Sequence, residues 1–156
     1  YEVLLSDYVL DSADGPRQLV VADGKRDPWI RGHATQLPKG TLAENAGNYG
    51  VIYNIALERK SSDGRGLAFI MWNFRHGQKW CDGMASSVQV NGEVIEVPSD
   101  ELAVYNPPDA VMVKYFPPVA EGETDTINIR YSPPGASCLP TPFIFMPVDP
   151  AAAESN

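Results

Sequence analysis

The side chains that could do metal or thiol chemistry lie in two short stretches of the sequence. The two histidines, His33 and His76, each lie beside a glycine, and Cys81 and Asp82 follow the second one closely. Metal sites favour His-x-His or Cys-x-x-Cys spacings, which this sequence lacks. A pair of His76 and Cys81 could activate a thiol nucleophile. Histidines bonded to backbone or water at strand ends explain the pattern more simply, so we expect no metal and no cofactor.

Other catalytic signatures are missing from the sequence. There is no Gly-x-Ser-x-Gly elbow, no glycine loop of the phosphate-binding kind, and no pair of carboxylates in a recognisable setting. The acidic stretches 11–15 and 23–27 resemble calcium loops, but neither has the alternating oxygen ligands that surround the ion. We interpret both as solvated turns, with a weak calcium site as the alternative. The sequence therefore predicts a protein that is not an enzyme and has no catalytic residue.

The two cysteines indicate in which kind of cellular compartment the protein resides. Cys81 and Cys138 are the only ones, and both lie in loop-like contexts. A bridge between them would close a long loop and stabilise the fold by about 4 kcal/mol in the chain-entropy model. We expect this disulfide and an oxidising compartment, with two free thiols as the alternative. A chain that starts at Tyr1 fits a secreted protein after signal removal, or a trimmed chain.

Two tryptophans could bind carbohydrate. Trp29 follows a proline at an expected strand start, and Trp80 lies in a loop rich in glycine and lysine. Indole rings can stack on the apolar face of a sugar, although packing is the more ordinary use of a tryptophan. Trp72 lies inside a wholly apolar strand, where we expect it in the core. A carbohydrate-binding module that uses Trp29 and Trp80 is therefore the alternative function.

The charge of the chain excludes some partners. The net charge is −8, and a nucleic-acid binder needs a basic surface instead. Residues 1–16 contain four acidic and no basic residues, and residues 117–156 contain five acidic residues beside Arg130 alone. No apolar run approaches the roughly 18 residues of a membrane span. We expect neither nucleic-acid binding nor a membrane span.

Strand patterns dominate the chain and predict an all-β fold. Residues 51–58 alternate apolar and polar side chains, residues 67–74 are apolar on both faces, and residues 87–97 read as a hairpin around Asn91-Gly92. Turns of Gly, Pro, Asn and Asp separate about ten short strands, a pattern typical of a single antiparallel β-sandwich. The other expected strands are 2–10, 17–22, 29–37, 101–105, 111–116, 126–131 and 143–148.

The expected organisation is an N-terminal strand and hinge (1–14), a β-sandwich domain (15–148) and a C-terminal tail (149–156). The N-terminal strand is apolar on both faces, and the polar run 11–16 after it would act as a flexible joint. Such a strand can complete a neighbour's sheet or be an ordinary first strand of its own sheet. The residues expected at a subunit contact are Tyr1, Val3, Leu5 and Val9 on one face and Leu4, Tyr8 and Leu10 on the other.

A corner is expected where residues 47–50 enter the next strand. Gly47 and Gly50 bracket it, and the Tyr49 hydroxyl could bond a nearby backbone carbonyl. The run 46–53, together with the late segment 129–134, resembles the C-terminal part of a secreted cyanobacterial family of unknown function. This resemblance implies an exported, β-rich protein and assigns no chemistry to any residue.

These observations predict a secreted, non-enzymatic structural protein, outside the cell or at the cell surface. The expected partner is the chain itself, in a filament or surface layer assembled by strand addition, which is a head-to-tail contact that does not close. Polysaccharide is the partner expected for the alternative function.

Overall fold

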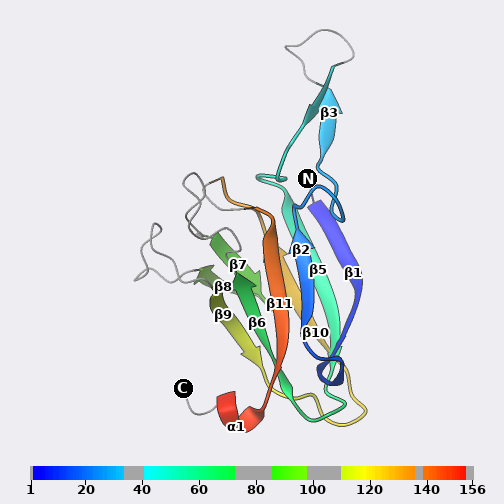
Figure 1. The fold of residues 1–156 in the computed structure, drawn as a ribbon, viewed down its shortest axis with the longest axis vertical. Helices are drawn as coiled ribbons and strands as arrows, with labels where there is room; N and C mark the ends of the chain where they lie inside the picture. The colour runs from blue at the N-terminus through cyan, green and yellow to red at the C-terminus, as the bar shows by residue number, and fades with distance from the viewer. Residues whose placement is uncertain (1, 34–40, 73–85, 98–109, 136–138, 154–156) are drawn as a thin grey trace.

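The computed structural model describes residues 2–33, 41–72, 86–97, 110–135 and 139–153. These residues are all-β, as predicted, and they form three sheets, so that a single sandwich of about ten strands is not confirmed. In Figure 1 the four-stranded sheet lies in front of the five-stranded one, and β3 extends from their upper end. The strands are β1 (Glu2–Asp11), β2 (Arg17–Val21), β3 (Arg31–His33), β4 (Leu42–Glu44), β5 (Ile52–Lys60), β6 (Gly66–Trp72), β7 (Ser86–Val90), β8 (Glu93–Val97), β9 (Ala110–Phe116), β10 (Asp125–Tyr131) and β11 (Thr141–Val148).

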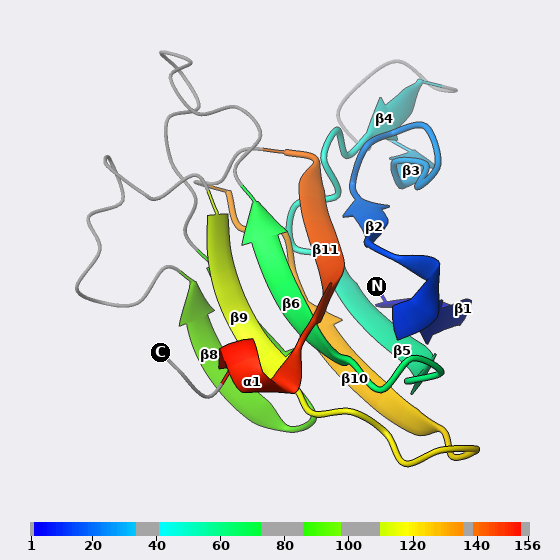
Figure 2. The same cartoon turned by 60° about the horizontal axis from the view of Figure 1, so that its bottom comes forward.

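The two larger sheets differ in the direction of their strands. The five-stranded sheet has the order β1-β5-β10-β7-β8, and β1 runs parallel to β5 while the other pairs are antiparallel. The four-stranded sheet, β2-β11-β6-β9, is antiparallel throughout. The pairs β1–β5 and β2–β11 therefore place consecutive strands β1 and β2 at edges of different sheets. In Figure 2 the short turn η1 (Ser12–Asp14) joins these two strands.

One core lies between the two larger sheets. Every second residue of β5 is buried, from Tyr53 through Ile55 and Leu57, as the alternation in the sequence predicted. From the facing sheet, Phe69 packs edge-on against Phe143 and stacks on Phe145, with both pairs of ring centroids 5.2 Å apart. Each such fully buried side chain contributes about 1.5–3 kcal/mol. The core thus fixes which face of β5 points inward.

Turn chemistry explains the best-predicted element, the hairpin β7–β8. Asn91 and Gly92 have φ of 49° and 87°. Positive φ at both central residues is typical of a type I′ turn, whose backbone twist matches the right-handed twist of the two strands that it joins. The central position of β6 is also confirmed. Trp72 was placed wrongly, because it is 39% exposed at the end of β6. Strand β4 was missed, and the expected strand 101–105 lies outside the described residues.

Helices are short in the described part of the chain. They are η1 and the single turn α1 (Pro150–Ala153), which follows β11 and lies near the lower end of the molecule in Figure 1. Over these ranges no helix has the length and apolar character needed to cross a membrane.

Candidate functional site

The candidate site is the edge strand β1 together with the loop that fixes its end. Among the described strands, β1 pairs with β5 alone. The register places Val9 opposite Glu58 and Leu10 opposite Arg59, after a shift between Leu5 and Tyr8. Leu10 is 2% exposed and belongs to the core, whereas Val9 on the other face is 56% exposed. The last residues of β1 are therefore firmly packed although the strand lies at an edge.

Asp11 fixes the end of β1 to the loop that follows β5. Its Oδ2 accepts a hydrogen bond of 2.7 Å from the Ser62 hydroxyl and lies 3.3 Å from the Lys60 ammonium. Its Oδ1 accepts from the backbone N–H groups of Ser62 and Ala13, both at 3.1 Å. The hydrogen bond from the Ser62 hydroxyl, opposed by partial burial and helped by the other donors, holds the pKa of Asp11 well below its ordinary range.

A second set of contacts holds the turn next to Asp11. Ser12 is fully buried, and its hydroxyl donates to Asp63. Arg65 bonds Asp63 through Nε at 2.7 Å and the Ser12 carbonyl through Nη2 at 3.0 Å. The hydrogen bonds from Ser12 and then Arg65 lower the pKa of Asp63. We call the set Asp11, Ser12, Lys60, Ser62, Asp63 and Arg65 the strand clamp.

The strand clamp holds the first residues of the segment 11–16, which the sequence predicted to be a flexible joint. The first part of that joint is the turn η1, which Asp11 caps by accepting from the Ala13 N–H. Beyond it, Gly15 adopts a φ of 79°, and Pro16 is exposed. In this state the joint is an anchored corner rather than a loose one, and only Gly15 and Pro16 lie between η1 and β2.

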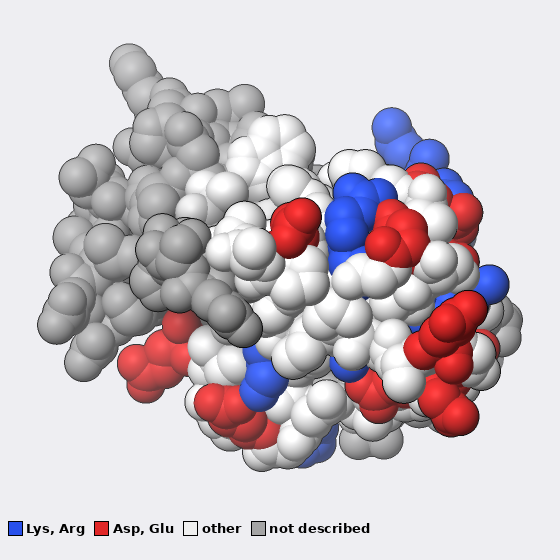
Figure 3. Space-filling model, turned by 90° about the horizontal axis from the view of Figure 1, so that it is seen from below, with Lys and Arg blue, Asp and Glu red and all other residues white. Residues whose placement is uncertain are grey.

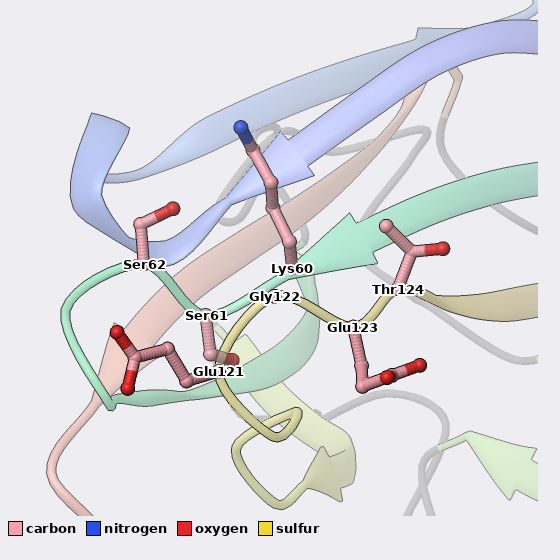
Figure 4. A pocket seen from close by; sticks show the side chains of 7 residues that line it. All are labelled: Lys60, Ser61, Ser62, Glu121, Gly122, Glu123 and Thr124. Atoms are coloured by element: carbon pink, nitrogen blue, oxygen red, sulfur yellow. The ribbon is translucent and has the colours of Figure 1, made fainter.

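A polar hollow of about 410 Å³ adjoins the clamp. Figure 4 shows that it lies between the loop after β5 and the loop before β10. Its lining has no aromatic ring, so it does not fit a stacked sugar. Three of its members already have partners, since Lys60 and the Ser62 hydroxyl bond Asp11, and the Ser61 hydroxyl accepts from the Val119 N–H at 3.0 Å. The hollow is lined by Lys60, Ser61, Ser62, Glu121, Gly122, Glu123 and Thr124.

The predicted corner at the upper end depends on Asn48 more than on Tyr49. Asn48 is fully buried, and its amide accepts from the Ile30 N–H at 2.8 Å and donates to the Tyr53 hydroxyl at 2.7 Å. Tyr53 in turn donates to Asp27. Burial, with the hydrogen bond to Asp27, raises the pKa of Tyr53. Sequence reasoning chose Tyr49 for this role, but that residue is 39% exposed.

Trp29, a predicted sugar-binding residue, has a packing role. Its indole ring covers Gly24 so closely that an added Cβ there would lie 2.6 Å from the ring. Its Nε1 donates to the Ala22 carbonyl at 3.3 Å. The ring closes the turn 23–27, in which the Asp23 carboxylate accepts from three successive backbone N–H groups. This turn is therefore an ordered polar turn, as we interpreted it from the sequence.

Most of the other side chains singled out from the sequence lie beyond the part of the chain that the structure describes. Trp80, Cys81, Cys138, His76 and Tyr1 lie outside the described residues. His33 ends β3, opposite Leu42. Among the described residues, no group of three or more His, Cys, Asp or Glu side chains is placed to hold a metal ion.

Most of the expected subunit-contact residues lie on β1. The backbone of Val3, Leu4, Leu5 and Tyr8 pairs with β5, as does that of Val9 and Leu10. Sequence reasoning missed the partners of this strand, namely Lys60, Ser62, Asp63 and Arg65. An aspartate followed by serine directly after an apolar strand was the available signal, because Asp and Ser commonly cap short turns.

The lower face of the molecule has mixed charge. In Figure 3 acidic and basic side chains lie beside one another over the described surface.

The chain matches no family model, and comparison with curated proteins and with solved structures gave no match. The resemblance to the cyanobacterial family therefore stays a prediction.

Proposed function

We propose that this chain is a secreted, non-enzymatic structural protein that forms a homopolymer outside the cell or at its surface by strand addition. The observation that carries the proposal is the position of β1. It is an edge strand of the five-stranded sheet, it has one described neighbour, and the next strand of the chain belongs to another sheet. A neighbouring subunit could therefore receive β1 without any rearrangement of the strands that follow it.

The physical reason for strand addition is the exposed backbone of a sheet edge. Unpaired N–H and C=O groups at an edge pair readily with a further strand, and such pairing gives main-chain hydrogen bonds to any compatible segment. A strand donated from each subunit to the next makes a head-to-tail contact, which propagates into a filament. A disulfide between Cys81 and Cys138 would suit the same oxidising location.

The proposal is tested first on the unmodified, non-reduced chain. Size-exclusion chromatography and electron microscopy over a range of concentrations should detect regular polymers that grow with concentration. A 17.0 kDa monomer at every concentration would contradict the proposal. The next assay would then be quenching of tryptophan fluorescence by a glycan panel.

A pair of variants tests whether β1 makes the polymer. Leu10→Asp places a charge at a core position of β1, whereas Val94→Asp alters a residue that is 65% exposed on β8, at the opposite edge of the same sheet. We expect the first variant to lose polymers and the second to keep them. Near-UV circular dichroism checks that each variant is folded, and regular polymers in folded Leu10→Asp would argue against strand addition.

A further inference from the structure

We infer that the acceptor of the donated strand is β5 of a second copy of this chain, and that the strand clamp locks the exchanged segment there. This inference rests on the proposed function. It adds which strand accepts β1, in which residue pairing, and at which residues the donated segment turns away from its own chain. The exchanged segment is Glu2–Asp14, and the second copy supplies Lys60, Ser62, Asp63 and Arg65.

The topology of β5 makes it the acceptor. One edge of β5 pairs with β10 over seven residue pairs, from Asp125 opposite Arg59 to Tyr131 opposite Tyr53. Among the strands that the structure describes, the other edge of β5 pairs only with β1. When β1 swings away, β5 exposes that edge, together with the site that Leu10 fills in the core. A second β1 restores both, because it carries the same sequence.

The clamp gives the exchange its specificity and register. The charged and hydroxyl partners of Asp11 and Ser12 all lie in the segment 60–65, which begins at the last residue of β5. The carboxylate of Asp11 meets a cation and a hydroxyl, and the hydroxyl of Ser12 meets a carboxylate. A strand that slipped along β5 would leave these partly buried polar groups unpaired. A second copy offers the complementary set at the same position.

The pivot lies between the clamp and β2. Gly15 has a φ of 79°, which favours glycine, and a Cβ at this position would meet no atom within 4 Å. Pro16 is exposed, and Leu19 of β2 is already in the core. Because the ring of Pro16 fixes its own φ, rotation at Gly15 moves β1 and η1 as one unit and leaves β2 in place. The second copy offers every contact that the moved unit loses in its own chain. The equilibrium between closed and exchanged chains therefore shifts toward exchange as the protein concentration rises.

A cysteine pair across β1 and β5 tests this inference in the full chain. Val9 and Glu58 are paired residues, and both are exposed, so the double variant Val9→Cys/Glu58→Cys should keep the fold. Neighbouring strands bring their Cα atoms within disulfide range. The variant is allowed to assemble, oxidised, and run on a denaturing, non-reducing gel.

The outcomes separate the inference from the proposed function. A covalent ladder of three or more chains is the expected result and supports both. A covalent dimer alone supports β5 as acceptor but overturns the polymer, because two chains that exchange strands reciprocally close on themselves. Crosslinks only within single chains, in material that forms polymers, overturn the acceptor assignment alone. Crosslinks only within single chains, in monomeric material, overturn both.

Two controls make the result specific. A mixture of the single variants Val9→Cys and Glu58→Cys should form heterodimeric crosslinks between positions 9 and 58 in excess of the homodimeric crosslinks that either variant forms alone. The matched control is Val9→Cys with Glu96→Cys, since Glu96 is exposed on β8 at the far edge of the sheet and should give no ladder. The unaltered chain, oxidised in parallel, reports any crosslinking through Cys81 and Cys138.

Discussion

Asn48 combines a left-handed backbone with a buried amide. Its φ is 49°, a region that asparagine tolerates better than most residues, and its side chain bonds three groups from two parts of the chain. These are the Ile30 N–H, the Pro28 carbonyl and the Tyr53 hydroxyl. The residue therefore connects the segment before β3 to the start of β5.

Two substitutions separate the hydrogen bonds of Asn48 from its backbone strain. Asn48→Gly loses the hydrogen bonds but keeps an easy φ, and we expect it to lower the free energy of unfolding by about 2 kcal/mol. Asn48→Ala should lose at least about 1 kcal/mol more, because alanine is strained at this φ. Urea denaturation measures both. Asn45→Ala is the control, since the Asn45 amide makes an exposed bond to the Tyr49 carbonyl. Equal losses in all three variants would refute this account.

Asp11 makes stability depend on pH. Because its pKa is lowered in the folded state, the unfolded chain binds the proton first as pH falls. The contribution of Asp11 is therefore complete above the ordinary pKa of about 4 and is lost as pH falls below it. Asp63 and Asp125, whose pKa values are also lowered, add to the same loss.

The variant Asp11→Asn should flatten that pH dependence. We expect its free energy of unfolding, measured in urea between pH 7 and pH 3, to fall less than that of the unaltered chain. Asp14→Asn is the control, because Asp14 forms an exposed ion pair with Arg17. A profile for Asp11→Asn as steep as that of the control would contradict the role of the clamp.

At the scale of elements, Arg59 joins β5 to β9 and β10. It is 6% exposed, and its guanidinium lies 5.4 Å from the centre of the Phe116 ring. It donates to the Pro117 carbonyl at 2.6 Å and to Asp125 at 2.7 and 3.0 Å. The guanidinium of Arg59, despite partial burial of Asp125, lowers the pKa of that carboxyl. This one side chain therefore fixes the lower ends of three strands.

Replacing Arg59 should cost much more than replacing an exposed arginine. We expect Arg59→Ala to lower the free energy of unfolding by about 3 kcal/mol, since a buried side chain loses its packing on Phe116 together with its bonds to the Pro117 carbonyl and the half-exposed Asp125. Arg31→Ala should cost less than about 1 kcal/mol, because the Arg31–Glu44 pair is exposed. Thermal and urea unfolding measure the difference. Similar losses in the two variants would count against a joining role for Arg59.

Local pattern predicted most elements but not how they pair. The alternation in β5 and the Asn-Gly turn of β7–β8 are properties of neighbouring residues, so that the sequence displays them directly. The parallel pairing of β1 with β5 is different, because it joins segments about 50 residues apart. Strand β4, at three residues, is too short to show a period. Trp72 was misjudged because an apolar strand can still end in solvent.

At the scale of the whole molecule, the all-β class follows from composition and turns, while the three-sheet arrangement does not. Sheet membership depends on which edges meet in space, and a one-dimensional pattern leaves many such pairings open. The candidate site was likewise predictable from the sequence only in part. The sequence indicated β1 and its apolar faces, but the clamp partners in 60–65 became visible only when the fold placed them beside Asp11.

The parallel pairing of β1 and β5 also sets an order of events during synthesis. β1 is translated before β5, and its partner is complete only when Lys60 has been added. At ribosomal speeds that interval lasts roughly 2–10 s. Hairpins such as β7–β8 form within microseconds of emerging. β1 thus spends seconds without its partner strand, whereas a hairpin such as β7–β8 can pair as soon as its second strand emerges.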